Sequence, residues 1–288
     1  MLADNTYPNL FLVGAPRCGT TTIVKFLEDF KEVFVPSVKE PMYLADELLR
    51  SQKIKRLVKV VDDGDEYIRM YASADPRQAY RVDASTSYLW TPGTAERIKK
   101  LSPDAKIIVV VREPVERAFS HYAHYVSRYG EKRSFSQFVS DGIKPNADSH
   151  DKHHVESGFY ARNLARYHKV FSPDQILLLN YNDLKSDPKA FYQKITRFLG
   201  LGDSPEMEII TERKNASNLH RPGLASKIYN WRYRLYGGKI PIPGTFKKLF
   251  RDKLLYEKPD EPTARLLEDL YRDDMVEFER MTGIKFYI

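Results

Sequence analysis

Short apolar runs alternate along the chain with segments in which apolar residues recur at helical spacing. Four of the runs are predicted to be buried strands: Asn9–Gly14, Ala79–Ala84, Lys106–Val111 and Gln175–Leu179. Four segments are predicted to be helices: Thr20–Phe30, Pro114–Tyr129, Pro188–Leu199 and Pro262–Met281. Because strands separated by helices imply right-handed crossovers, we expect an α/β fold with a mainly parallel central sheet flanked by helices.

The rest of the pattern contains no clear interdomain linker. The longest stretches without regular periodicity are Asp141–Glu156 and Gly202–Pro243, and loops of that length are usually functional or disordered. We therefore expect a single domain over residues 1–288. Its core would cover about residues 9–222, and a helical C-terminal extension would cover about residues 223–288.

Composition narrows the class of protein. Hydrophobic residues make up 42% of the chain, which suffices for a packed core, and a single cysteine excludes an intrachain disulfide or a cysteine-based zinc site. No apolar run is long enough to span a membrane, and the first residues lack the basic region of a signal peptide, so we expect a cytoplasmic protein. The 46 basic residues exceed the 39 acidic ones, and the net charge of +7 mildly favours an anionic ligand.

The segment from Gly14 to Thr22, Gly-Ala-Pro-Arg-Cys-Gly-Thr-Thr-Thr, lies between a predicted strand and a predicted helix. Its glycines permit a tight turn, and backbone N–H groups at the start of a helix attract phosphate. The glycine spacing is that of a Walker A loop, but Thr20 stands where that loop requires lysine, and Arg17 lies inside the loop instead. The segment therefore predicts a site for a nucleotide phosphate. For Cys18 we favour a packed small residue over a reactive thiol.

This loop resembles the phosphate-binding loop of sulfotransferases that use 3′-phosphoadenosine-5′-phosphosulfate (PAPS), in the variant typical of many bacterial members. That loop reads Pro-Lys/Arg-x-Gly-Thr-Thr/Ser, and the matching residues here are Pro16, Arg17, Cys18, Gly19, Thr20 and Thr21. The resemblance implies a P-loop NTPase-like fold of the sulfotransferase type. It also implies that Arg17, Thr20 and Thr21, at a helix start that includes Thr22, hold the 5′-phosphate and the transferring sulfonate.

A second basic motif begins where the strand Lys106–Val111 ends. Arg112 stands at the strand end where open α/β sheets bind ligands, and its guanidinium can hold a phosphate through two hydrogen bonds. Taken alone, Arg112 could equally form an ion pair at the strand end. The family's 3′-phosphate motif is Arg-x-Pro-x-x-Arg-x-x-Ser-x-Tyr, and the matching residues are Arg112, Pro114, Arg117, Ser120 and Tyr122. The resemblance therefore implies that Arg112 and Ser120 bind the 3′-phosphate.

Sulfonate transfer also needs a base for the acceptor proton. Glu40 is the first candidate, since Val-Lys-Glu-Pro-Met-Tyr resembles the Lys-Glu-Pro-His-Phe-Phe segment in which glutamate is the base of carbohydrate-type and bacterial enzymes. Met42 and Tyr43 depart from that pattern. Glu40 lies just beyond a short predicted strand, Glu32–Val35, and a solvated loop carboxylate is the alternative.

Asp83 is the second candidate base, and it opens a segment that lies near the acceptor in the family. The resemblance implies that Asp83, Ser85 and Tyr88 bind the substrate. Ala84 stands where heparan-type enzymes carry lysine, and Thr86 stands where proline is usual. These departures weaken any expectation of heparan-like specificity.

Further basic residues and histidines could also serve a site. Arg213 and Lys214 resemble a late basic loop that closes over the cofactor, although a solvated loop fits them as well. His121 and His124 lie one turn apart on a predicted helix, but no third ligand accompanies them, so we expect helix-surface histidines and no metal site. The pair of histidines at 153 and 154 is expected in a polar loop, either on the substrate side or inert.

The expected activity is in-line transfer of a sulfonate group from PAPS to an acceptor hydroxyl or amine, leaving 3′-phosphoadenosine 5′-phosphate (PAP) and requiring no metal. The acceptor stays open between a carbohydrate, a lipid headgroup and a small molecule, and the oligomeric state is open as well. One alternative is a P-loop kinase or NTPase using ATP and Mg²⁺, against which the missing lysine argues. The other is a nucleic-acid-binding protein, for which Trp231–Tyr236 is the only basic and aromatic stretch; we expect no nucleic-acid partner.

Overall fold

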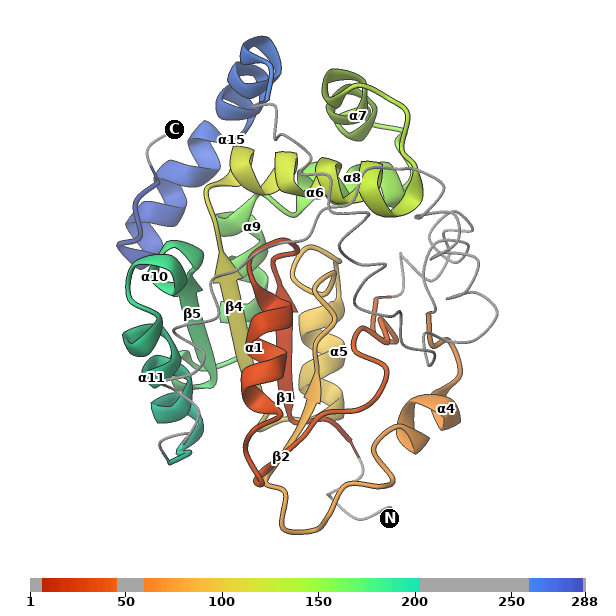
Figure 1. Cartoon of the computed structure of the whole chain (residues 1–288), viewed down its shortest axis with the longest axis vertical. Coiled ribbons are helices and arrows are strands. Elements are labelled where there is room, and N and C mark those ends of the chain that lie inside the picture. Colours follow the sequence, from red (N-terminus) through yellow and green to blue (C-terminus); the bar gives the residue numbers. More distant parts are fainter. Residues whose placement is uncertain (1–6, 46–59, 203–258, 287–288) are drawn as a thin grey trace, which may run out of the picture.

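Five parallel strands form one sheet at the centre of the protein (Figure 1). The computed structural model describes residues 7–45, 60–202 and 259–286. Within them the strand order is β2-β3-β1-β4-β5, and every neighbouring pair is parallel. The strands are β1 (Leu10–Gly14), β2 (Val33–Phe34), β3 (Tyr80–Asp83), β4 (Lys106–Val111) and β5 (Ile176–Asn180). The predicted α/β class and parallel sheet are confirmed.

The register of the strands places their carboxyl ends at a common edge. Leu10 of β1 lies opposite Lys106 of β4, and Val111 at the end of β4 lies opposite Asn180 of β5. The strands β1 and β4 are completely buried apart from Lys106, which matches their uninterrupted apolar sequences. Residues that follow β1, β3 and β4 therefore emerge together, where ligands of open parallel sheets bind.

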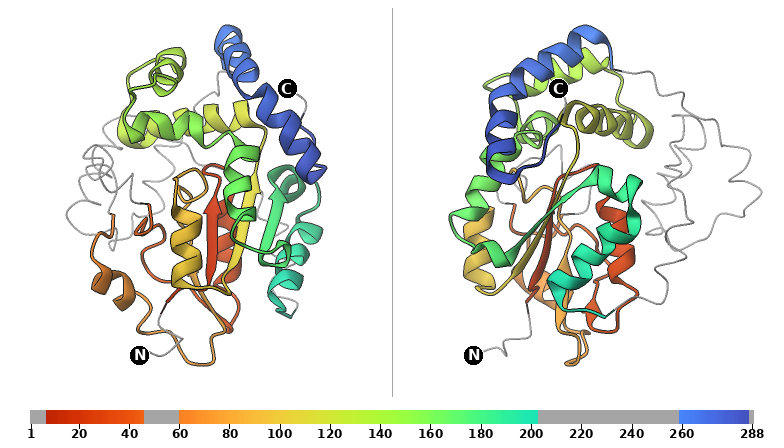
Figure 2. Two further views of the ribbon diagram at one scale, coloured as in Figure 1. Left: turned by 180° about the vertical axis from the view of Figure 1, so that it is seen from behind. Right: turned by 90° about the vertical axis from the view of Figure 1, so that its left-hand side faces the viewer.

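Helices cover both faces of the sheet, as Figure 2 shows in the view along its edge. On one face lie α1 (Thr20–Leu27), α10 (Tyr181–Ser186) and α11 (Pro188–Leu199); on the other lie α5 (Thr94–Leu101) and α9 (Tyr160–His168). Beyond the carboxyl ends of the strands lie α6 (Pro114–Tyr129), α7 (Phe135–Gly142), α8 (Ser149–Glu156) and α15 (Glu261–Thr282). A short helix, α4 (Gly64–Arg69), and a 3₁₀ turn, η1 (Pro173–Gln175), complete the described elements.

The strong periodic patterns locate their helices well. Helix α6 and helix α11 have the predicted bounds, and α15 extends the predicted Pro262–Met281 by one residue at each end. Helix α1 is shorter than predicted and ends at Leu27, because the chain then tightens into turns in which Asp29 and Phe30 bond back three residues. Phe30 still packs in the core.

One prediction about local structure was wrong. The stretch Asp141–Glu156 was expected to be irregular, but its second half forms α8. Asp148 caps this helix by accepting a hydrogen bond from the Asp151 N–H, and its buried residues are two histidines, His150 and His154, with a single aliphatic residue, Val155. A pattern search keyed to apolar residues overlooks such a helix. Of the other long stretch, Gly202–Pro243, all but Gly202 lies outside the described residues.

The last helix joins the rest of the fold. Leu267, Tyr271 and Phe278 of α15 are buried, and the Tyr271 hydroxyl donates a hydrogen bond of 2.9 Å to the Val155 carbonyl at the end of α8. Among the described residues, no helix combines the length and the apolar character needed to cross a membrane.

Candidate active site

The phosphate loop connects β1 to α1 and depends on two glycines. Gly14 and Gly19 both have positive φ, 153° and 81°. A Cβ on Gly14 would lie 2.8 Å from the Cβ of Leu89, and one on Gly19 would lie 3.0 Å from the Tyr181 ring. Gly19 is also the N-cap of α1, and as a glycine it has no side chain to cap the N–H groups of the first turn. The loop therefore combines a close backbone approach with a helix N-terminus that can bind an anion.

Side chains of the loop divide into packed and accessible groups. Pro16, Cys18 and Thr20 are buried, whereas Arg17 is half-buried and Thr21 is exposed. Burial raises the pKa of the Cys18 thiol to about 11, so the thiol stays protonated and unreactive at neutral pH, as we expected of a packed residue. Arg17 and Thr21 thus present the polar groups of the loop.

The second basic motif lies beside this loop. Arg112 follows β4 directly, with only 18% of its side chain exposed, and its guanidinium contacts the Tyr181 ring 5.2 Å away. It pairs with Glu116 one turn into α6 at 2.8 Å. Ser120 of α6 accepts a hydrogen bond of 3.3 Å from Nε of Arg17. This bond joins the phosphate loop to the second motif across 103 residues of sequence, so the two predicted anchors lie at one edge of the sheet.

Glu40 lies in the segment after β2, next to Lys39, whose ammonium contacts the loop at Thr21. The hydroxyl of Thr86 donates to one carboxylate oxygen at 3.0 Å, and the Lys39 ammonium lies 3.3 Å from the other. The Glu40 side chain remains 30% exposed. The carboxylate is therefore oriented by two neighbours and remains partly accessible to solvent.

Lys39 is a site residue that sequence reasoning missed. Its ammonium donates a hydrogen bond of 2.8 Å to the Thr21 hydroxyl, so it bridges the phosphate loop and Glu40. The sequence did hold a signal for this role. Thr20 stands where a Walker A loop has lysine, and Lys39 directly precedes the candidate base and could have been considered as the replacement cation. Lys39 brings a positive charge into contact with the loop from a different segment of the chain.

Asp83 lies beneath the Glu40 segment and is completely buried. Its carboxyl accepts hydrogen bonds from the Ser85 hydroxyl at 2.6 Å, from Tyr67 at 2.7 Å and from Tyr88 at 2.9 Å. Ser85 and Tyr88 in turn accept the backbone N–H groups of Met42 and Leu44. Substrate contact by Asp83, Ser85 and Tyr88 stays a prediction, and their burial favours a role in positioning the segment that carries Glu40.

Asp83 should make stability depend on pH. Burial raises the pKa of Asp83 to about 6, above the usual 3.8, so the folded protein holds this proton more tightly than the unfolded chain. The stability that Asp83 contributes is then present below about pH 4 and lost as the pH rises through about 6. From pH 4.5 to 7.5, the difference in unfolding free energy between wild type and Asp83→Asn should shrink by roughly 2 kcal/mol. Urea unfolding of both proteins across this range measures it; a constant difference would contradict the shifted pKa.

The histidines are more buried than we predicted. His121 was expected at the helix surface, but it is 4% exposed and faces α8, where His154 is 4.9 Å away between ring centres. His153 and His154 were expected in a polar loop, but they belong to α8, and His154 is 1% exposed. Burial and nearby cationic groups, chiefly Arg17, lower the pKa of His124 to about 3. His124 is therefore neutral at physiological pH and a poor base.

These features describe a parallel α/β protein with a glycine-containing loop and an uncapped helix N-terminus after its first strand, and with a second basic motif after β4. The family model of the sulfotransferase family matches residues 8–205, and the chain belongs to that family. The predicted family resemblance is thereby confirmed.

Arg213 and Lys214 lie outside the described residues.

Curated relatives and solved structures agree with this assignment. The chain is 25% identical over 267 residues to carbohydrate sulfotransferase 15 of Mus musculus, covering 75% of this chain and 48% of the relative. It is 26% identical over 285 residues to human heparan sulfate glucosamine 3-O-sulfotransferase 6, covering 97% and 73%. A sulfotransferase from Alicyclobacillus acidocaldarius superposes with a TM-score of 0.71 at 22% identity, covering 97% of each chain, which supports the fold. The chain spans about half the length of the carbohydrate sulfotransferases it matches.

Proposed function

We propose that this protein is a PAPS-dependent sulfotransferase whose acceptor is a carbohydrate hydroxyl or amine. The observation that carries the proposal is the Arg17–Ser120 hydrogen bond, because it joins the loop that we expect to bind the 5′-phosphosulfate to the motif that we expect to bind the 3′-phosphate. ATP carries phosphates on the 5′ side only, whereas PAPS needs both anchors. Membership in the sulfotransferase family supports the same reaction class.

The residues present suit PAPS as a ligand. The loop backbone from Gly14 to Gly19 and the start of α1 would hold the 5′-phosphosulfate, with Arg17 and Lys39 as the cationic partners. Arg112 and Ser120 would hold the 3′-phosphate. PAPS supplies the sulfonate group and a phosphate leaving group; the protein supplies charge neutralisation, orientation and a base.

Glu40 would take the acceptor proton as the acceptor oxygen or nitrogen bonds to sulfur. Arg17 and Lys39 would neutralise the negative charge that develops on the 5′-phosphate oxygen as its bond to sulfur breaks, so charge and proton are both accounted for. Thr86 and Lys39 hold the Glu40 carboxylate, and the Asp83 network holds its backbone segment. The proposed reaction needs no metal ion, and we place it in the cytoplasm.

The names of the relatives support a carbohydrate acceptor, since those enzymes are named for carbohydrate and heparan sulfate. A thermal-shift titration with PAP and with ATP–Mg²⁺, followed by transfer of radiolabelled sulfate to glycosaminoglycan oligosaccharides and to small alcohols, tests the proposal. We expect PAP to stabilise the protein and oligosaccharides to be labelled. Stabilisation by ATP–Mg²⁺ alone would indicate a kinase or NTPase and overturn the assignment.

Arg112→Ala should weaken PAP binding about 10- to 100-fold, the usual cost of removing a charged hydrogen-bond donor from a phosphate. Adenosine 5′-phosphosulfate, which lacks the 3′-phosphate, should lose little affinity. Calorimetric titration of both ligands measures the difference, and Arg265→Ala, which removes an exposed arginine of α15, is the matched control. Equal losses for the two ligands would show that Arg112 does not hold the 3′-phosphate.

Glu116→Gln tests the same contact from the other side. Glu116 neutralises Arg112 in this structure, so it competes with a phosphate for the guanidinium. Because its side chain is 54% exposed, the pair is worth little, and the substitution should tighten PAP binding by only about 2- to 5-fold. Weaker PAP binding by this variant would mean that Glu116 orients Arg112 for the ligand instead of competing with it.

A further inference from the structure

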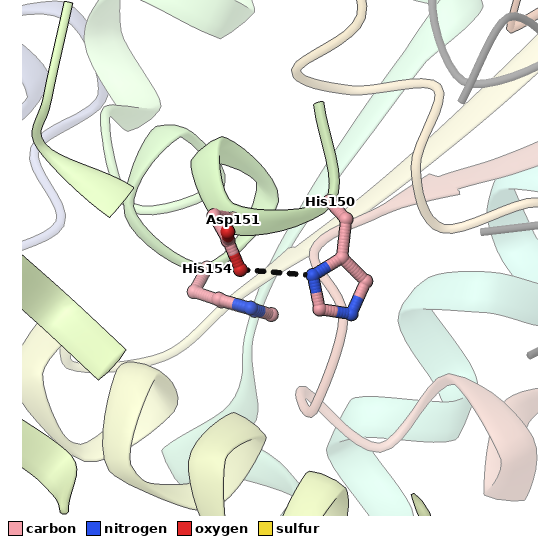
Figure 3. A group of neighbouring side chains, drawn as sticks. All are labelled: His150, Asp151 and His154. Carbon is pink, nitrogen blue, oxygen red and sulfur yellow. Dashed lines mark hydrogen bonds and ion pairs between the residues drawn. The ribbon is translucent and has the colours of Figure 1, made fainter. Parts of the chain in front are cut away.

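Helix α8 carries two histidines at a spacing known from metal sites. His150 and His154 stand at positions i and i+4, which places both imidazoles on one side of the helix, and Asp151 is adjacent (Figure 3). Each of the three residues offers one ligand atom, and these atoms all lie within 4.8 Å of one another. Two histidines at this spacing on a helix are a frequent ligand pair for zinc.

Several imidazole nitrogens of this region have no hydrogen-bond partner among the described residues. Both ring nitrogens of His154 are buried without a partner, in a side chain that is only 1% exposed. Three more imidazole nitrogens nearby are in the same situation: Nδ1 of His121, Nε2 of His150 and Nε2 of His153. Buried polar atoms in folded proteins almost always have a partner, so an ion or ordered water is expected beside them.

Asp151 is arranged as a carboxylate ligand would be. One of its oxygens is hydrogen-bonded to Nδ1 of His150 at 3.0 Å. The two atoms therefore already lie about as close as two ligands of a tetrahedral zinc ion, which are roughly 3.3 Å apart for bonds of about 2.0 to 2.1 Å, and zinc would replace the proton between them. Arg133 holds the same oxygen at 3.0 Å, the kind of outer contact that orients a ligating carboxylate. The Asp151 side chain is 17% exposed, which gives an ion a route from solvent.

Charge around the cluster favours a cation on the Asp151 side. Arg133 pairs with Glu131, Asp141 and Asp151, and Lys144 also pairs with Asp141, so this network holds three carboxylates and two cations. On the opposite side, the buried Arg117 guanidinium donates to the His154 carbonyl. Arg117 would repel a cation bound here. The bonds from the histidine nitrogens and the Asp151 oxygen must therefore outweigh that repulsion.

We propose that His150, Asp151 and His154 bind a zinc ion that links two turns of α8, through residues to which we assign no role in sulfonate transfer. Imidazole and carboxylate are the ligand types that suit zinc, and three protein ligands leave one position to water. An eight-residue helix is marginal by itself, and a bond between its successive turns would stabilise it. The stabilised face packs on the rings of Tyr125 in α6 and Phe138 in α7.

Metal analysis of the full-length protein tests the site. The protein is stripped with EDTA, reloaded with Zn²⁺ or Co²⁺ alone, and examined by elemental analysis, visible absorption and thermal unfolding. We expect about one zinc per chain, intense visible bands from tetrahedral cobalt, and a higher melting temperature with zinc. His150→Gln and Asp151→Asn should each weaken zinc binding at least about tenfold.

His168→Gln is the matched control, because His168 is an exposed histidine at the end of α9. It should bind zinc as the wild type does. The proposal fails if the wild type retains no zinc after reloading, or if His150→Gln and Asp151→Asn bind as tightly as His168→Gln. Should either α8 variant not fold, the cobalt spectrum of the wild type decides, since octahedral cobalt or no bound cobalt would exclude the site.

Discussion

Arg17→Ala should lower kcat for sulfonate transfer by about 10²- to 10³-fold and leave the fold intact. This loss is the usual cost of removing one hydrogen-bond donor that is already positioned to stabilise negative charge in the transition state. Arg17 is half-buried, and its Nε donates to Ser120, so its guanidinium is already held beside the loop where we propose that the sulfonate binds. Steady-state rates with PAPS and the best acceptor measure the loss, and thermal unfolding checks the fold.

Arg17→Ala changes the side chain without changing the backbone conformation that position 17 must adopt, so a loss of rate can be assigned to the lost guanidinium. Arg17 has a φ of 72°, and alanine is as disfavoured there as arginine, so strain in the loop should be similar in both proteins. Arg17→Lys keeps the charge and should restore most of the rate, since the family accepts either residue at this position. A kcat within twofold of wild type for Arg17→Ala would remove Arg17 from the chemistry.

The parts of this protein that could be predicted from its sequence are those set by local patterns. The β-branched run Lys106–Val111 has no competing structure and became β4 without a change of bounds. The glycines of the phosphate loop require positive φ, which is a local property of the chain. Because β1 and β4 are neighbours in a parallel sheet, Arg17 and Arg112 had to emerge at the same edge.

Contacts that join distant segments had no such local signal. The Thr86 hydroxyl reaches Glu40 across 46 residues, at a position where the family pattern has proline, which has no hydroxyl to donate. In the sequence this threonine counts only as a departure from the motif. The contact exists because the segments after β2 and β3 lie side by side in the sheet.

The burial of polar side chains could not be predicted from the sequence either. Asp83 reads as a reactive carboxylate in the sequence, yet three hydroxyls surround it in the interior. His121 and His154 have polar side chains, and a hydropathy pattern assigns such residues to the surface. Networks of this kind compensate the cost of burial through mutual contacts, and these contacts depend on the tertiary structure.

Glu40→Gln should reduce kcat by about 10²- to 10⁴-fold with little change in PAP affinity, because glutamine keeps the shape of the side chain but cannot accept the acceptor proton. The amide oxygen can still accept from Thr86, although the contact with Lys39 is lost. The backbone N–H groups of Met42 and Leu44 stay bonded to Ser85 and Tyr88, so the segment should keep its position. Rates under saturating PAPS, together with PAP binding by calorimetry, separate the chemical step from ligand binding.

Thr86→Val supplies the matched comparison for Glu40. It leaves the carboxylate in place but removes one of the two contacts that orient it, so kcat should fall by only about 3- to 10-fold. The critical result is that kcat falls more in Glu40→Gln than in Thr86→Val, because loss of the base should cost more than loss of a contact that positions it. An unchanged kcat for Glu40→Gln would exclude it as the base. Asp83 would not then replace it without a rearrangement that exposes its buried carboxyl, and His124, with its pKa of about 3, would be too weak.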